Sequence, residues 1–272
     1  MEKEFYRKLK SKTLNDIACG KITYDKLDNI LRADKEVVLE AIRHESFVYY
    51  DVPENLKNDR EIVLASLKKY GLMLEFVSDE LKKDREIVFT AVKQCGFALK
   101  YADQIFKEDK EIVFEAIKSD GWALQFVGRK FLRDPNFLFS AVKYHGYAFE
   151  LLPKKYKRDK NFIEKCIKEH GYILRFIDPK LRLNYLFLEK LVKINGYCLK
   201  YIPDVYKDDL NLALVAVKQN GLSISFVEGH LRKNKEIIIE AIKQNRESYD
   251  FVDNSMKLDK DVSAAFMQYS MI

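Results

Sequence analysis

Glycine, proline and cysteine are scarce in this chain of 272 residues, which contains 10 Gly, 5 Pro and 4 Cys. So little glycine and proline argues against collagen-like or loop-rich folds and against long disordered linkers. No two cysteines form a Cys-x-x-Cys pair, and none stands at a metal-ligand spacing from histidine. We therefore expect reduced thiols, as in a cytoplasmic protein, with no metal site and no cofactor.

Long hydrophobic runs are also absent, since no stretch approaches the roughly 18 apolar residues of a transmembrane helix. The start of the chain, Met1 to Phe5, is charged and no apolar segment follows it, so the sequence predicts no signal peptide. Glycine-rich phosphate-binding loops, Walker sequences and paired-carboxylate motifs are missing as well. What is present is a globular composition, 47% hydrophobic and 33% charged, with a net charge of +6.

A period of 25 residues runs through most of the chain. Counting from Asp34 as position 0, every 25th residue is Asp or Asn, with no insertion or deletion: Asp34, Asp59, Asp84, Asp109, Asp134, Asp159, Asn184, Asp209, Asn234 and Asp259. Position 12 is glycine in seven repeats, whereas Ser46 and Arg246 replace it in the first and ninth: Gly71, Gly96, Gly121, Gly146, Gly171, Gly196 and Gly221. A fixed period of this length is typical of solenoids and related arrays.

Each repeat predicts an α-helix that begins after position 0. The Asp or Asn there is a typical N-cap, and the Glu often found at position 2 suits the positive end of the helix dipole. Positions 3, 4, 7 and 8 are apolar and form one helical stripe, for example Ile87, Val88, Ala91 and Val92. We expect the glycine to end a helix of about eleven residues in the left-handed C′ conformation.

A second short apolar segment follows the glycine, for example residues 122–127. Its Ala-Leu-x-aromatic spacing favours a short helix, α or 3₁₀, over a strand, and a loop with one more apolar anchor comes after it. Because one repeat cannot bury its apolar face alone, neighbouring repeats must stack. We predict an all-α fold, an α-solenoid of two-helix repeats, with N-terminal capping helices at 1–33, nine repeats at 34–258 and a C-terminal capping helix at 259–272.

The repeat pattern D-[KR]-E-[IV]-V-x-x-A-[VI]-K-x-x-G-x-A-L-x-[FY] resembles a tandem-repeat domain of unknown function, in which two such repeats make one family unit. Residues 84–96 and 109–121 match best, and the resemblance weakens from Pro135 and Asn136 onward. The family occurs in amoeba-associated intracellular bacteria, some protists and large viruses. The resemblance implies a solenoid with an interaction role. Some members are thought to be secreted effectors, which would place this chain in a host cytosol.

Position 11 is the one column whose side chains are typical of catalysis. It holds a nucleophile, an acid and two histidines before it turns to Asn: Cys95, Asp120, His145, His170, Asn195, Asn220 and Asn245. Such a set suggests a hydrolase or a transferase. Stacked repeats, however, place equivalent side chains about 10 Å apart, whereas a nucleophile and its base need about 3 Å. We interpret the column as polar residues at helix C-termini and expect no enzyme.

Basic residues gather in the loops of repeats four to six. Between residues 128 and 160, nine Lys and Arg stand against three Asp and Glu, an excess equal to the net charge of the whole protein. We predict a binding ridge there, formed by Arg129, Lys130, Arg133, Lys154, Lys155, Lys157, Arg158, Lys180 and Arg182. Such a ridge suits an acidic protein, a nucleic acid or an anionic lipid surface. The alternative is an ordinary solvated edge.

Two further columns have both a functional and a structural interpretation. Position 9 is basic in all nine repeats, which suits either a phosphate backbone or the negative end of the helix dipole. Position 13 is aromatic in five successive repeats, from Phe97 to Tyr197, which suits either base stacking or core packing. We favour the structural interpretation of both columns.

The predicted function is a non-enzymatic scaffold that binds a macromolecule. A protein partner is the first expectation, and binding of RNA or DNA through the basic ridge is the alternative. The sequence leaves the oligomeric state open.

Overall fold

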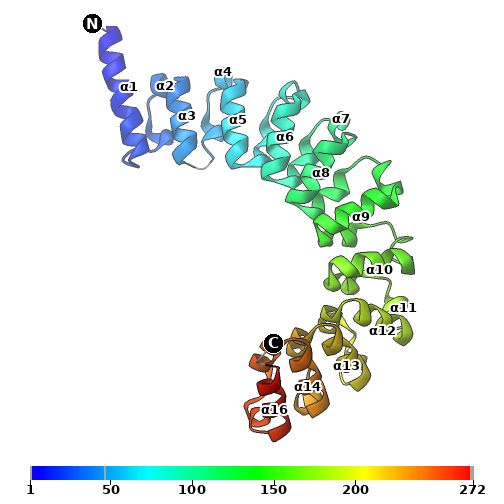
Figure 1. Cartoon of the computed structure of the whole chain (residues 1–272). Helices are drawn as coiled ribbons and strands as arrows, with labels where there is room; N and C mark the ends of the chain where they lie inside the picture. Colours follow the sequence, from blue (N-terminus) through cyan, green and yellow to red (C-terminus); the bar gives the residue numbers. More distant parts are fainter. Residues whose placement is uncertain (1, 46, 270–272) are drawn as a thin grey trace. The chain divides into compact units, whose positions relative to one another are not determined.

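The computed structural model describes residues 2–45 and 47–269, and all of their regular secondary structure is helical. Residues 270–272 of the predicted C-terminal cap and Ser46 lie outside the described residues. The chain forms two compact units, Met1–Asp134 and Pro135–Ile272. Within each unit the repeats stack in chain order, as Figure 1 shows for α3, α5, α6 and α8 in the first and for α9, α10, α12, α13 and α14 in the second. The prediction of an all-α repeat solenoid is confirmed.

Each repeat begins with an α-helix that covers positions 1 to 10. These helices are α3 (Lys35–His44), α5 (Arg60–Lys69), α6 (Arg85–Gln94), α8 (Lys110–Ser119), α9 (Pro135–Tyr144), α10 (Lys160–Glu169), α12 (Tyr185–Ile194), α13 (Leu210–Gln219) and α14 (Lys235–Gln244). In most repeats the residue at position 0 is the predicted N-cap; the Asp84 side chain, for example, accepts from the N–H groups of Glu86 and Ile87. Positions 3, 4, 7 and 8 are buried throughout the stack.

The second helix of each repeat is a 3₁₀ helix. The series is η2 (Val48–Asp51), η3 (Gly71–Phe76), η5 (Gly96–Tyr101), η6 (Gly121–Phe126), η8 (Gly146–Leu151), η9 (Gly171–Phe176), η10 (Gly196–Tyr201), η12 (Gly221–Phe226) and η14 (Arg246–Phe251). Positions 14, 15 and 18 of this segment face the core, as Ala98, Leu99 and Ala102 do. The preference for a helix over a strand is therefore confirmed.

The predicted loop contains a third helical piece in most repeats. These pieces are α4 (Glu54–Lys57), η4 (Leu81–Lys83), α7 (Gln104–Lys107), η7 (Phe131–Arg133), α11 (Pro179–Arg182), η11 (Asp204–Tyr206), η13 (Gly229–Lys233) and α15 (Asn254–Lys257), whereas residues 154–158 form a turn. The expected apolar anchors are buried at Phe106, Phe131 and Tyr156. A two-helix repeat was thus too simple a prediction, because the anchor is held by a helical turn of its own.

The repeat frame extends in front of Asp34. The first elements are α1 (Glu2–Ala18), η1 (Tyr24–Lys26) and α2 (Asn29–Arg32), and the last helix is α16 (Lys260–Gln268). Lys10 stands 25 residues before Lys35, and its Nζ lies 2.9 Å from carboxylate oxygens of both Asp34 and Glu36. Tyr24 and Leu27 are buried at positions 15 and 18 of the same frame. The first 33 residues are therefore a divergent repeat that covers the end of the stack.

The repeat glycines do not adopt the left-handed conformation that we predicted. Among the described residues, φ is positive only at Phe47, Gly20 and Gly229. The helix instead ends in an extended residue at position 11, such as Asn195 with φ −147°. Glycine is needed next because a Cβ on Gly196 would lie 2.5 Å from the carbonyl oxygen of Ala216, in the following repeat. Gly71, Gly96 and Gly221 meet the alanine carbonyl of the following repeat in the same way, so in these repeats the spacing of glycine and alanine reflects a close backbone approach.

A side-chain amide holds the same two repeats together. Gln219, at position 10, accepts at 2.6 Å from the N–H of Gly196 in the preceding repeat. Gln94 accepts at 2.6 Å from the Gly71 N–H and donates at 2.8 Å to the Lys69 carbonyl oxygen. Each amide thus bonds to the turn between helix and 3₁₀ helix of its neighbour, and satisfies backbone groups that a helix terminus leaves unpaired.

Ion pairs join the amino ends of neighbouring helices. The basic residue at position 1 meets the acidic residues at positions 0 and 2 of the next repeat: Lys35 with Asp59 at 2.8 Å and Glu61 at 2.9 Å, Arg60 with Asp84 at 2.9 Å and Glu86 at 2.5 Å, and Lys235 with Asp259 at 2.7 Å and Asp261 at 3.1 Å. The hydrogen bond from Arg60 lowers the pKa of Asp84, and that from Lys235 lowers the pKa of Asp259. Where Asn184 and Leu186 replace the acids, Lys160 lies over the Phe187 ring instead, 5.3 Å from its centroid.

The glycine contact predicts a position-specific cost of a single methyl group. Gly196→Ala should destabilise the protein by about 1–3 kcal/mol, because the added Cβ meets backbone that cannot move without shifting the next repeat. Gly171→Ala should cost less, since the nearest atoms to its Cβ, 3.1 Å away, belong to the Asn195 side chain. Urea denaturation measures the free energy of unfolding of both variants, and an equal decrease for the two would contradict the proposed backbone contact.

The ion pairs predict a loss of stability in acid. A carboxylate whose pKa is lower in the folded than in the unfolded protein stabilises the fold fully above the unfolded pKa of about 3.9. This contribution is lost as the pH falls through the pKa of the folded state. Asp84→Asn, which keeps a good N-cap, should therefore lower the melting temperature at pH 7 and lower it by less as the pH falls toward 3. Asp103→Asn, on a capping residue without such a pair, is the control. If Asp84→Asn lowers the melting temperature by the same amount at pH 7 and at pH 3, the result would be evidence against these pairs.

Candidate binding surfaces

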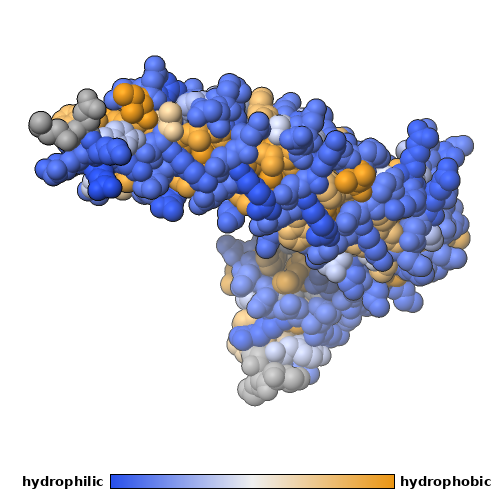
Figure 2. Space-filling model, turned by 90° about the horizontal axis from the view of Figure 1, so that it is seen from above, coloured by the Kyte–Doolittle hydropathy of each residue, from blue (hydrophilic) through white to orange (hydrophobic). Residues whose placement is uncertain are grey.

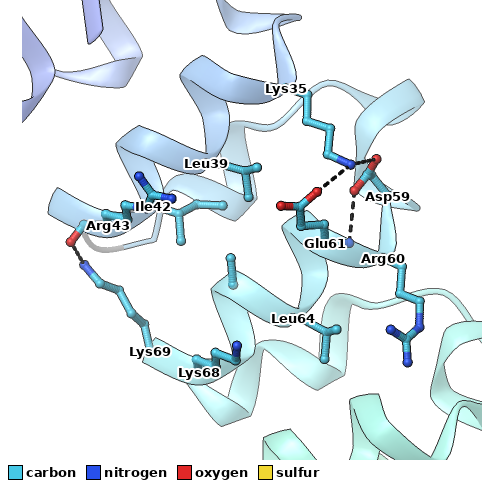
Figure 3. Close-up of a pocket in the computed structure, with 11 residues that line it drawn as sticks. Lys35, Leu39, Ile42, Arg43, Asp59, Arg60, Glu61, Leu64, Lys68 and Lys69 are labelled. Carbon is cyan, nitrogen blue, oxygen red and sulfur yellow. Dashed lines mark hydrogen bonds and ion pairs between the residues drawn. The ribbon is translucent and has the colours of Figure 1, made fainter. Parts of the chain in front are cut away.

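A groove lies between α3 and α5 in the first unit, with a volume of about 650 Å³. Its apolar residues are Leu39 and Ile42 from α3 and Leu64 and Ala65 from α5. Figure 3 shows the Leu39, Ile42 and Leu64 side chains between the two helices, with charged side chains at both ends. The groove thus combines an apolar floor with a polar rim, as ligand sites commonly do.

The two ends of the groove differ in charge. At the amino ends of the helices, the Lys35 Nζ lies between Asp59 and Glu61 and forms an ion pair with each (Figure 3). The carboxyl ends carry three basic side chains: Arg43, Lys68 and Lys69. Arg43 pairs with Glu40 at 2.7 Å, and the Lys69 Nζ donates at 2.6 Å to the Arg43 carbonyl oxygen, whereas the Lys68 side chain is exposed. This end therefore attracts negative charge.

The first two repeats differ from the next three in side-chain size at position 5 and in the backbone after the α-helix. Position 5 is Leu39 and Leu64 in the first two repeats and a larger Phe in the next three, and position 6 is the small Ala65 in α5. The first repeat also has Ser46 instead of glycine at position 12. Correspondingly, Phe47 has a φ of 67° and η2 begins only at Val48. We did not predict this groove from the sequence, although the loss of glycine at position 12 and of Phe at position 5 marks the first repeat as different.

The predicted ridge is divided between the two units, so its members are described separately. In the first unit, Arg129, Lys130 and Arg133 have exposed side chains near η7. The Lys130 Nζ pairs with Glu108 at 3.2 Å.

In the second unit, half of the ridge residues bond within the protein. The Lys157 Nζ donates to the Glu150 carbonyl oxygen, Arg182 donates to the Arg175 carbonyl oxygen at 3.1 Å, and Arg158 pairs with Asp178 at 2.7 Å. Lys154, Lys155 and Lys180 are exposed, and Lys155 lies over the Tyr156 ring at 4.6 Å from its centroid. Only these three lysines remain as an outward basic cluster in this unit.

Lys157 and Arg182 belong to a repeated structural contact. A basic residue at position 23 donates to the carbonyl oxygen at position 16, at the end of the 3₁₀ helix: Lys82 to Glu75, Lys107 to Lys100 and Lys207 to Lys200 make the same bond. Burial lowers the pKa of Lys107 and of Lys157. The recurrence of a basic residue at position 23 was the sequence signal that these side chains cap a helix.

The residues of position 11 lie at the start of the 3₁₀ helices. The Asp120 side chain accepts from the Trp122 N–H at 2.9 Å, and Asn195 does the same for Tyr197 at 3.1 Å. His170 Nε2 lies 3.1 Å from the carbonyl oxygen of Lys143, at the end of the preceding helix. The described residues contain no group of three or more His, Cys, Asp or Glu arranged to hold a metal ion. Asp120, Asn195, Asn220 and Asn245 thus cap their 3₁₀ helices, whereas the side chains of Cys95, His145 and His170 make no such bond; we had assigned the whole column to the helix C-terminus.

Of the two remaining columns, position 9 lies in the last turn of the α-helix as we expected, whereas position 13 differs from our expectation. Position 9 is exposed on the α-helices, for example at Lys93 and Lys193. Position 13 is not in the core: Trp122 and Tyr147 are both 42% exposed, and Tyr172 and Tyr197 are half-buried. The core interpretation of position 13 is therefore wrong, because the 3₁₀ helix buries positions 12, 14 and 15 and turns position 13 outward. Figure 2 shows hydrophobic residues as separate patches on a largely hydrophilic surface.

The capping contact predicts that lysines of the ridge differ in their contribution to stability. Lys157→Ala should cost about 1 kcal/mol, since it leaves the Glu150 carbonyl oxygen without its donor. Lys154→Ala, three residues earlier and exposed, should change stability by less than about 0.5 kcal/mol. Chemical denaturation of both variants measures the difference, and identical values would argue against the cap.

Comparison with known proteins supports the resemblance seen in the sequence. In the described part of the chain, the helices are too short or too polar to cross a membrane. No curated protein and no solved structure matches the chain. The model of one family, Domain of unknown function (DUF4116), matches it five times in tandem, at residues 34–82, 84–133, 134–182, 184–232 and 226–257. The chain therefore belongs to the DUF4116 family.

Proposed function

We propose that this protein is a non-enzymatic scaffold that binds another protein through the groove between α3 and α5. The observation that carries the proposal is the apolar floor of this groove, in which the half-buried Leu39, Leu64 and Ala65 lie open to solvent between α3 and α5. Repeat proteins commonly bind partners along the surfaces that their stacked units create. A cytoplasmic location, or a host cytosol for a secreted effector, stays a prediction from the sequence.

The partner that this groove favours is an amphipathic helix with acidic residues at one end. Helices α3 and α5 have ten residues each, which is about 15 Å and about three turns of a bound helix. The apolar side of such a helix would cover Leu39, Leu64 and Ala65, in the manner of other helix-in-groove complexes. Its acidic residues would meet Lys68 and Lys69, at the end that lacks a balancing carboxylate in the groove.

The basic ridge supports binding less strongly. Lys130, Lys157, Arg158 and Arg182 make ion pairs or hydrogen bonds within the protein, and Lys155 lies over the Tyr156 ring. The outward lysines Lys154, Lys155 and Lys180 remain a secondary surface for an acidic partner.

A display experiment tests the proposal. A phage library of helical peptides is panned on the full chain, and the selected peptides are measured against the double variant Leu39→Phe, Leu64→Phe. Phe is the natural residue at this position in the next three repeats, so the variant should fold while its rings fill the groove. We expect selected peptides to bind at least about tenfold more weakly to it, a loss of about 1.4 kcal/mol.

Leu214→Phe, at the same position of α13 in the second unit, is the matched control and should bind like the native chain. Selected peptides should carry apolar residues at helical spacing and acidic residues at one end. If the library yields no peptide that distinguishes the native chain from the groove-filled variant, the proposal fails.

A further inference from the structure

A stripe of aromatic side chains runs over the 3₁₀ helices of the second unit. It consists of Tyr147, Tyr172, Phe176, Tyr197, Tyr201 and Phe226, at positions 13 and 17 of η8, η9, η10 and η12. These 3₁₀ helices contact one another in chain order. None of the six side chains is buried, so the aromatic stripe faces solvent although its residues are regularly spaced.

The rings of the aromatic stripe contact one another across repeats. The centroid of Tyr147 lies 5.2 Å from that of Tyr172 and 6.0 Å from that of Phe176 in the next repeat. Tyr197 meets Phe226 edge to face at 5.0 Å. Each ring is held by a neighbouring ring on one side, so its exposed part is already ordered. The side chains therefore lose little conformational entropy when a flat ligand binds.

Two cations stand among these rings. The exposed Lys200 Nζ lies 5.4 Å from the centroid of Phe226, 5.6 Å from that of Tyr201 and 5.7 Å from that of Tyr197. The exposed Arg175 guanidinium lies 5.0 Å from the centroid of Phe176. Both are at position 16, where Glu150 and Asp250 stand in the outer repeats. The positive segment of the aromatic stripe is therefore limited to η9 and η10.

The charge of the surrounding unit has the same sign. Residues 135–272 contain 23 Lys and Arg against 17 Asp and Glu, a difference of +6 that equals the net charge of the whole protein. This unit therefore attracts anions at long range, whereas the first unit is neutral.

We propose that the aromatic stripe with Arg175 and Lys200 binds single-stranded nucleic acid. Bases stack on exposed aromatic rings without regard to sequence, and cations between the rings meet the phosphates that join the bases. An acidic protein segment would use the cations, but its carboxylate side chains do not stack on the rings as bases do, and a duplex hides its bases. This surface lies outside the α3–α5 groove, and the inference does not depend on the protein-binding function proposed above.

Binding of a labelled single-stranded oligouridine to the full chain, followed by fluorescence anisotropy, tests this inference. Contacts from Arg175 and Lys200 to two phosphates should weaken binding about sevenfold between 50 and 200 mM salt. Arg175→Gln with Lys200→Gln should abolish most of this salt dependence, whereas Lys193→Gln, on an exposed residue of α12, should leave it unchanged. Tyr147→Ala should weaken binding about tenfold and Tyr147→Phe should not, because the ring stacks and the hydroxyl does not.

The competitors distinguish single strands from other anions. A duplex of the same length, inorganic polyphosphate and polyglutamate should each compete much less well than the unlabelled single strand. Equal competition by polyglutamate or polyphosphate would show a general anion surface, and equal competition by the duplex would show that bases are not stacked; either result overturns the proposal. Absence of binding at 50 mM salt also overturns it. Circular dichroism of each variant establishes that it is folded.

Discussion

The contact on which this structure depends is the approach of a glycine in one repeat to the carbonyl group of an alanine in the next. It sets how closely neighbouring helices pack, since a single added methyl group would overlap the backbone. The amide of Gln94 or Gln219 then bonds to the N–H of that glycine. Close approach and hydrogen bond support each other, because the amide reaches the glycine only when the repeats are near.

Charges on the surface follow from the same spacing. A cation at position 1 reaches the acids at positions 0 and 2 of the next repeat because a full period separates them. The same Asp side chain that caps its own helix therefore also bonds to the preceding repeat, as Asp84 does. In the second unit the acids of position 2 give way to Asn161 and Leu186, and the unit keeps an excess of positive charge. The interruption of this ladder of pairs therefore accounts for part of the charge difference between the units.

The candidate binding surfaces arise where the repeat departs from its own pattern. The groove lies beside the repeat that has no glycine at position 12 and has Leu instead of Phe at position 5. The aromatic stripe carries its cations where position 16 changes from Glu150 to Arg175 and Lys200. Positions that vary little, such as the buried position 7 and the mostly basic position 23, serve the stack itself. Variable residues on constant backbone are how repeat proteins acquire distinct surfaces.

The sequence by itself determined the period, the α-helices with their N-caps and the buried face at positions 3, 4, 7 and 8, because these depend on local chemistry and on residue spacing. It also placed side chains one period apart beside each other. Only the tertiary structure decided why glycine is required, since the group that excludes a Cβ belongs to the next repeat. It likewise decided that Lys157 caps a 3₁₀ helix while Lys154 points outward, and that Tyr147 is a surface residue. Two lysines or two aromatic residues look alike in a sequence, and they differ only in which partner the fold brings within reach.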